Sequence, residues 1–263
     1  MMQVFPIDNN MTTATEILEL LANYQMLPKL LRCRIIDRAI ASIDLTEQQQ
    51  QSAIEQFHQR HQLTAEAQRQ AFALRYGMKL EQLNILAMRE LKIELFKTAS
   101  WGAKLESYFL THKSKLDKVV YSLLRTKNLE VARELYFRIS AGEQSFAELA
   151  QEYSEGSEVQ TCGLVGPVEL SVPHRDLAKL LSISQPGQIW TPRRLGEWFV
   201  VVRLEKFISA VLDEAMRQRL LDRLFETWLE KQVSQEIKNW GVGKGESQEV
   251  AIHPTTPASL ISV

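Results

Sequence analysis

Apolar residues recur at helical spacing in the first part of the chain. Thr13 and Glu16 form an S/T-x-x-E capping box, and the apolar residues after it repeat every three or four positions. Pro28 suits the first turn of a second helix, which carries a wide apolar stripe. We therefore predict two helices, which end near Met26 and before Asp44, and we expect the second to be heavily buried.

Two phrases of similar build follow, and each opens with Leu-Thr. A threonine in this place can accept a hydrogen bond as the N-cap, so Thr46 and Thr64 are predicted to begin two short helices. Gly77 is placed like the residue that follows a helix end. The phrase LEQLNILAMRELKIELFK after it has the apolar period of a long amphipathic helix, and a further helix is predicted over 99–112.

The pattern changes at Lys118. The run VVYSLL is short, apolar and β-branched without a helical period, which is typical of a strand. Helical spacing returns over 129–140, and Ser145 with Glu148 forms another capping box before FAELAQEYS. A second module with strand and helix content therefore begins here.

The rest of the chain alternates loop, helix and strand signals. Residues 154–173 are rich in Ser, Gly and Pro and predict a loop with a short strand at 164–165. A short helix is predicted over 175–181, and EWFVVVRLEKF predicts a strand buried on both faces. A long amphipathic helix follows over 210–240, and residues 241–263 are polar with prolines, so we expect a disordered tail.

Together these elements predict an α+β fold. Residues 1–117 and the helix at 209–240 would form one helical domain. The small antiparallel β-sheet and its helices, residues 118–208, would be inserted between them.

The charges of the chain balance, with 31 Lys and Arg residues against 32 Asp and Glu residues. No overall field draws such a chain to nucleic acid or to anionic lipid, so neither is expected as a partner. No stretch is apolar enough to span a bilayer, and the start lacks a basic segment followed by a long apolar one. We therefore expect a cytoplasmic protein without membrane insertion.

Residues that could hold a metal are sparse. Cys33 and Cys162 lie far apart without a CxxC motif, which argues against zinc, redox catalysis and a disulfide framework, and we expect both to be buried. His58 and His61 share a helix face, but without a carboxylate-histidine motif they indicate a solvated surface. No Gly-rich phosphate loop is present either, so a metal or nucleotide enzyme is disfavoured.

Two longer phrases in the second module carry a family resemblance. ISAGEQSFAELAQEYSEGSEVQTCGLVGPV has a helix pair with F-x-x-L-A-x-x-Y-S, a glycine-bearing loop and a strand placed like G-D-L-G. PGQIWTPRRLGEWFVVVRLEKF has a turn, a short strand and a closing strand like G-Y-H-I-I-K. The module thus resembles the parvulin-type (PpiC-like) peptidyl-prolyl isomerase domain. The helices around it resemble SurA/PrsA-type foldases, in which the last helix folds back to complete the helical domain.

This resemblance implies a prolyl-binding pocket beside two histidines and an Asp or Cys, and it implies no cofactor. Carried over position by position, these three catalytic positions fall on Tyr121, Gly156 and Phe199, so all three polar groups are substituted. The strand aspartate becomes Leu164. The positions expected to bind substrate are Leu164, Val165, Val172, Leu177 and Leu181, with His174 at the rim.

Each candidate also has a purely structural interpretation. Tyr121 could offer its hydroxyl to a substrate carbonyl, but a strand tyrosine is more often part of the core. Phe199 fits a core position better than a pocket wall. Cys162 flanks the pocket, but the family's thiol position is Gly156. His174 could partly replace a lost histidine.

Two functions fit a module with substituted polar positions. An apolar pocket could suffice for a slow isomerase, because desolvation of a prolyl amide favours its less polar, twisted form. The resemblance then implies a peptidyl-prolyl isomerase or foldase that acts on unfolded or nascent polypeptides containing proline. The alternative is a catalytically inactive chaperone or adaptor that binds a specific partner. A homodimer is compatible with either function.

Overall fold

The computed structural model describes residues 4–7 and 10–242 and divides them into two compact units. The helical unit contains the residues up to Leu105 and those from Arg217 onward, and the inserted unit is Glu106–Met216. The predicted α+β fold, in which a small antiparallel sheet is inserted into a helical domain, is confirmed. The division falls at Leu105 rather than at residue 117, because the helix before the sheet groups with the inserted unit.

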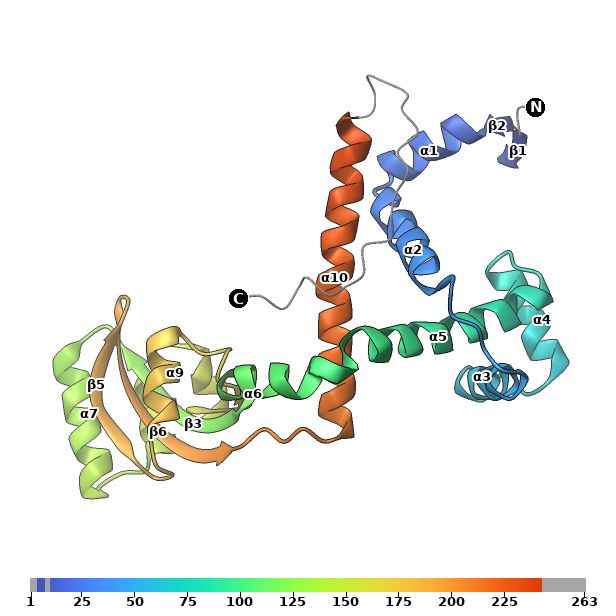
Figure 1. The fold of residues 1–263 in the computed structure, drawn as a ribbon. Coiled ribbons are helices and arrows are strands. Elements are labelled where there is room, and N and C mark those ends of the chain that lie inside the picture. The colour runs from blue at the N-terminus through green and yellow to red at the C-terminus, as the bar shows by residue number, and fades with distance from the viewer. Residues whose placement is uncertain (1–3, 8–9, 243–263) are drawn as a thin grey trace. The chain divides into compact units, whose positions relative to one another are not determined.

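The helical unit begins with an antiparallel hairpin that the sequence pattern did not predict. Its elements are β1 (Val4–Ile7), β2 (Asn10–Thr13), α1 (Ala14–Asn23), α2 (Leu27–Ile40), α3 (Glu47–Arg60), α4 (Glu66–Arg75), α5 (Leu80–Trp101) and most of α10 (Glu214–Val242) (Figure 1). A capping box begins α1 at Thr13, and Thr46 is the N-cap of α3, as predicted. The predicted N-cap Thr64 is wrong, because Ala65 precedes α4 and its N–H donates to the Gln68 side chain at 2.9 Å.

Aromatic side chains hold α5 against α10. Phe96 and Trp101 of α5 contact Phe225 and Trp228 of α10, with ring centroids 5.3 to 6.3 Å apart. Three of these four rings are at most 7% exposed. Large buried aromatic surfaces contribute strongly to stability, so residues far apart in the sequence complete one core.

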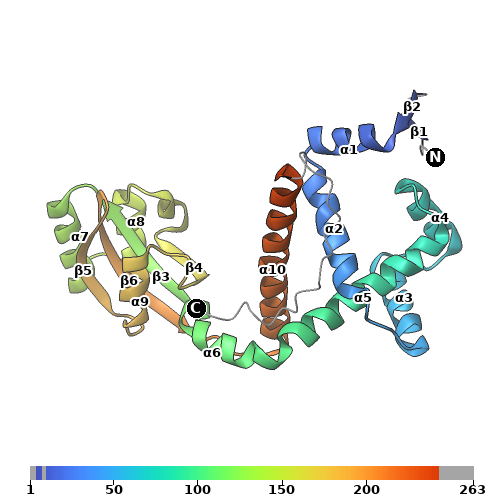
Figure 2. The ribbon, with the colours of Figure 1, turned by 45° about the horizontal axis from the view of Figure 1, so that its top comes forward.

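The inserted unit is a four-stranded antiparallel sheet with helices on both faces. Its elements are α6 (Leu105–Leu116), β3 (Lys118–Thr126), α7 (Leu129–Ala141), α8 (Phe146–Tyr153), the 3₁₀ helix η2 (Ser157–Thr161), β4 (Leu164–Glu169), α9 (Arg175–Ser182), β5 (Ile189–Leu195) and β6 (Trp198–Ile208). The strand order is β4-β3-β6-β5. Helices α7 and α8 pack on one face and α9 on the other (Figure 2).

The chain enters and leaves the sheet at one place. The side chain of Asp117, just before β3, accepts a hydrogen bond from the backbone N–H of Ala210, just after β6, at 2.7 Å. The Lys113 ammonium lies 2.9 Å from the same carboxylate oxygen and also donates to the Ser209 hydroxyl at 2.6 Å. The two ends of the inserted sheet are therefore fastened to each other.

Several other expectations differ from the structure. Strand β5 was expected only from the family resemblance, since Pro192 and two arginines interrupt its apolar pattern. Cys33 and Cys162 are exposed rather than buried. The final helix continues to Val242, and the rest of the predicted tail, residues 243–263, lies outside the described residues. Within the described part of the chain, no helix combines the length and apolar character needed to cross a membrane.

Candidate functional site

The register of the sheet sorts the site candidates onto two faces. Tyr121 of β3 lies opposite Leu204 of β6 and Val165 of β4, whereas Thr126 lies opposite Phe199. Side chains alternate between the faces along a strand, so Tyr121 and Arg125 share a face that Thr126 does not. We call this the α9 face, because its core includes Leu177 and Leu181 of α9.

The α9 face is apolar over most of its area. Its buried core consists of Val119, Tyr121, Leu123, Leu170, Leu177, Leu181, Val200, Val202 and Leu204. Partly exposed apolar side chains border this core, among them Val165, Trp190, Leu195 and Trp198. The exposed border offers an apolar surface on which part of a polypeptide could lose its hydration.

A buried ion pair closes one end of this face. Arg125 donates from Nε to both carboxylate oxygens of Glu158, at 2.8 and 3.0 Å, and a further bond runs from its Nη2. The Ser154 hydroxyl donates to the same carboxylate at 2.6 Å. The Glu158 side chain is only 2% exposed, whereas that of Arg125 is 29% exposed. Arg125 is therefore the member of the pair that reaches solvent.

Gly156 leaves the space in which this pair sits. A Cβ atom at position 156 would lie 2.1 Å from Arg125 Nε and 2.3 Å from Glu158 Oε2. Real Cβ atoms do not approach other atoms so closely, so any side chain here would displace the pair. The ion pair thus fills the volume into which the Asp or Cys expected in a parvulin loop would extend.

The contact between Arg125 and Glu158 also affects the pKa values of Glu158 and of Tyr121. Burial tends to raise the pKa of Glu158, but the hydrogen bonds from Arg125 and Ser154 outweigh it and hold the pKa below its usual value. Burial raises the pKa of Tyr121, Arg125 lowers it in part and Glu158 raises it further. At neutral pH Glu158 is an anion, and Tyr121 keeps its proton and can donate a hydrogen bond.

Acid is expected to weaken the inserted unit through Glu158. Because its pKa is lower in the folded chain than the unfolded value of about 4.3, its contribution is complete above that value and is lost as the pH falls through the folded pKa. Urea unfolding midpoints measured from pH 7 to pH 3 should therefore fall more steeply for the natural chain than for an Arg125→Met/Glu158→Leu double variant. Equal slopes would contradict a stabilising carboxylate at position 158.

Two of the three predicted catalytic positions come together, and the third does not. Arg125 lies against Gly156 and interacts electrostatically with Tyr121, so these residues share one end of the α9 face. Phe199 packs instead against the core of α7 and α8, on the opposite face. The expectation that Phe199 lies beside Tyr121 is wrong, and the residue before it, Trp198, borders the α9 face instead.

The predicted substrate-binding positions divide in the same way. Val165 borders the α9 face, but Leu164 pairs with Ser122, points to the opposite side and is 49% exposed. Leu177 and Leu181 are buried beneath α9, so they support the face rather than offer it to a ligand. Val172 is exposed in the loop before α9.

The histidines do not assemble a polar site. His174 is exposed and acts as the N-cap of α9, where its ring accepts from the Asp176 N–H at 3.3 Å. His61 packs against the rings of Phe57 and Phe72 in the helical unit. In the parts of the chain that the structure describes, no group of three or more His, Cys, Asp or Glu residues is placed to hold a metal ion.

Sequence reasoning missed Arg125, Glu158 and Trp198. Arg125 stands four residues after Tyr121 on one strand, so alternation alone could have placed it on the same face. Glu158 carried no comparable signal, because its contact with Arg125 depends on how the loop after α8 folds back. Ser154 anchors that loop by accepting from the Arg125 N–H at 3.0 Å.

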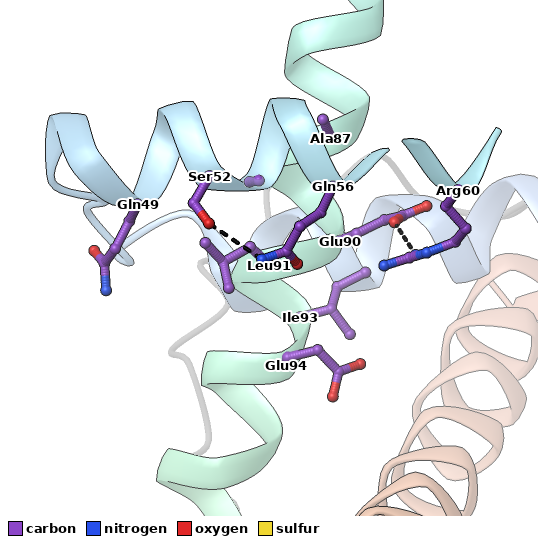
Figure 3. A pocket seen from close by; sticks show the side chains of 10 residues that line it. Gln49, Ser52, Gln56, Arg60, Ala87, Glu90, Leu91, Ile93 and Glu94 are labelled. Atoms are coloured by element: carbon purple, nitrogen blue, oxygen red, sulfur yellow. Dashed lines mark hydrogen bonds and ion pairs between the residues drawn. The ribbon is translucent and has the colours of Figure 1, made fainter. Parts of the chain in front are cut away.

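A separate cavity of 450 Å³ lies in the helical unit, between α3 and α5 (Figure 3). It is lined by Gln49, Ser52, Ala53, Gln56, Arg60, Ala87, Glu90, Leu91, Ile93 and Glu94. Ser52 and Gln56 are joined by a hydrogen bond of 3.1 Å, and Arg60 and Glu90 form an ion pair at 2.7 Å. Amide and hydroxyl groups thus stand beside a few apolar side chains, a mixture that suits a peptide backbone.

Comparison with known proteins identifies the inserted unit. The model of the Rotamase family, the PPIC-type PPIASE domain, matches residues 117–206. The chain contains a PPIC-type domain. The predicted parvulin-type module is confirmed, and the matched range contains the whole sheet except the last two residues of β6. No curated protein matches the sequence.

Three solved structures resemble the chain at low identity. Peptidylprolyl isomerase PrsA of Bacillus cereus is 15% identical with a TM-score of 0.49, over 94% of this chain and 93% of that one. PrsA of Bacillus anthracis is 15% identical with a TM-score of 0.46, over 85% of this chain and 100% of that one. The parvulin domain of PpiD from E. coli is 24% identical with a TM-score of 0.33, over 37% of this chain and 95% of that one.

Proposed function

We propose that the chain is a foldase whose PPIC-type domain receives proline-containing segments of unfolded polypeptides on the α9 face. The observation that carries this proposal is the apolar border of that face, which the partly exposed side chains of Val165, Leu195 and Trp198 form around the buried core. An extended segment with a proline ring can place its apolar parts there and leave its ends in solvent.

The chemistry available at this face suits slow isomerisation. Rotation of a prolyl bond must pass a twisted state in which amide resonance is lost, against a barrier of about 18–20 kcal/mol. A surface that removes water favours this less polar state, and no bond to a cofactor is needed. The α9 face has no histidine among its described residues, so we expect catalysis well below that of a fully equipped parvulin.

The helical unit supplies a second contact for the client. The cavity between α3 and α5 has the size and the mixed polar lining to receive a short stretch of polypeptide with little demand on its sequence. Binding at two places on one chain would raise the local concentration of proline segments near the α9 face.

A second candidate function is that of a chaperone or adaptor without catalysis. The specific observation in its favour is the substitution of the expected polar positions by Tyr121, Gly156 and an apolar aromatic residue. Prolyl isomerisation measured on the full chain, by exchange spectroscopy on short peptides with and without added protein, separates the two functions. Rates above buffer support the foldase, and binding without any acceleration supports the chaperone.

Peptide binding is expected to depend on Val165 and not on its neighbour. Val165→Asp places a charge on the apolar border and should weaken binding of an unfolded, proline-containing client by about tenfold or more, because the carboxylate loses water when the client binds. Leu164→Asp is the matched control, since Leu164 lies on the other side of the same strand. Fluorescence titration with a labelled client measures both, and equal losses in the two variants would contradict the proposed face.

A further inference from the structure

A row of side chains crosses the sheet at the polar end of the α9 face. Arg125 of β3 lies opposite Val200 of β6, and Val200 lies opposite Arg193 of β5. Val200 belongs to the core of the α9 face, so both arginines project on that side. Two strand spacings, about 10 Å, separate their backbones. Between them, and one step along β6 on the same face, lies Trp198.

Aromatic rings hold these cations in place. The Arg193 guanidinium lies 5.8 Å from the Trp190 ring centre, and the indole N–H of Trp190 donates to the Ser184 hydroxyl at 2.8 Å. The Arg125 guanidinium lies 5.9 Å from the Trp198 ring centre. A cation within about 6 Å of a ring centre is attracted to the ring, so these contacts help to keep both guanidinium groups on the α9 face.

Arg193 is the unbalanced charge of the row. Among the described residues, no carboxylate forms an ion pair with it. Arg125 is neutralised by Glu158, although its Nη1 makes no hydrogen bond within the described residues. Lys127, 5.0 Å from the Trp198 ring centre, pairs with Glu197 at 3.4 Å, and both of these side chains are more than half exposed. Because an exposed ion pair is weak, another anion can easily replace Glu197 as the partner of Lys127.

We propose that this row selects clients that carry an acidic residue next to the proline, with Arg193 as the main contact and Arg125 as its support. This inference rests on the proposed function, because it concerns the client of the same α9 face. A proline ring on the apolar border lies within a side-chain length of the row. An Asp or Glu beside the proline can then pair with Arg193, which has no carboxylate partner among the described residues, and such charge-assisted hydrogen bonds are stronger than neutral ones.

The chain contains a matched control for this assignment. Arg194, the next residue on β5, lies opposite Phe199 and so projects on the face of α7 and α8. Arg193→Gln and Arg194→Gln change the net charge by the same amount on adjacent exposed positions. Only the first removes a cation from the α9 face.

The test is binding of three proline peptides to the full chain, identical except for Glu, Gln or Lys next to the proline. One set varies the residue before the proline and a second set the residue after it. The Glu peptide of at least one set should bind about three- to fivefold more tightly than its Gln peptide, as an exposed charge pair allows. Arg193→Gln should abolish this difference, and Arg194→Gln should leave it intact. Added salt should reduce it.

Two failures remain distinguishable. If the Gln peptides bind to the α9 face and Glu gives no gain in either set, the assignment of the row is overturned while the proposed function stands. If Arg193→Gln and Arg194→Gln reduce the preference equally, the preference reflects net charge and the assignment is again overturned. If no peptide of any charge binds, the proposed function itself fails.

Discussion

Replacing Arg125 with methionine is expected to lower the free energy of unfolding of the inserted unit by about 2–3 kcal/mol. The change leaves the Glu158 carboxylate, only 2% exposed, without its cation. Removing one member of a buried ion pair commonly costs about 3–5 kcal/mol, and the 29% exposure of the Arg125 side chain reduces that figure here. Urea unfolding followed by tryptophan fluorescence measures the loss.

The double variant Arg125→Met/Glu158→Leu supplies the control. Apolar residues of similar size often replace a buried ion pair with little cost, so the double variant should recover most of the lost stability. It would still lack the guanidinium at the surface of the α9 face. If the double variant were as unstable as Arg125→Met alone, the loss would come from the packing of the arginine stem and not from the stranded charge.

Replacing Gly166 with alanine is expected to lower the free energy of unfolding of the inserted unit by about 3–4 kcal/mol. Gly166 has a φ of +116°, which residues with a side chain rarely adopt, and its Cβ would lie 2.5 Å from the backbone oxygen of Val119. The strained backbone accounts for about 1–2 kcal/mol. The clash with a fixed strand atom adds about as much again or more, because a packed interior yields little.

Gly187 separates these two contributions. It has a φ of +83°, but no atom lies within 4 Å of the place where a Cβ would be built. Gly187→Ala should therefore show the backbone cost alone, about 1–2 kcal/mol. Thermal unfolding of the two variants side by side measures the difference. Equal losses would mean that β4 moves away from β3 without resistance.

Local signals explain why the helices could be predicted. Thr13 and Thr46 begin helices because a side-chain oxygen in the right place satisfies a free backbone N–H, whatever the rest of the fold does. Strand β5 lacks such a signal. Pro192 and the exposed arginines break its apolar alternation, and it becomes a strand because β6 offers hydrogen bonds along its edge.

The site shows where sequence reasoning stops. Tyr121 and Gly156 were found because each stands at a fixed distance from a recognisable phrase. Phe199 was expected beside Tyr121 but lies on the opposite face of the sheet, because neighbouring residues of a strand point to opposite sides. Glu158 comes to Arg125 only through the folded loop, so its partner is 33 residues away and no local pattern records the contact.

The contact between α5 and α10 has a consequence for the order in which the protein is made. Phe225 and Trp228 reach the rings of Phe96 and Trp101 only after a ribosome has passed the whole PPIC-type segment, residues 117–206. The sheet, by contrast, has all its strands once Ile208 has been added. Domains generally fold as units during synthesis. The N-terminal helices therefore emerge first, but their core is completed only after the inserted sheet has been synthesised.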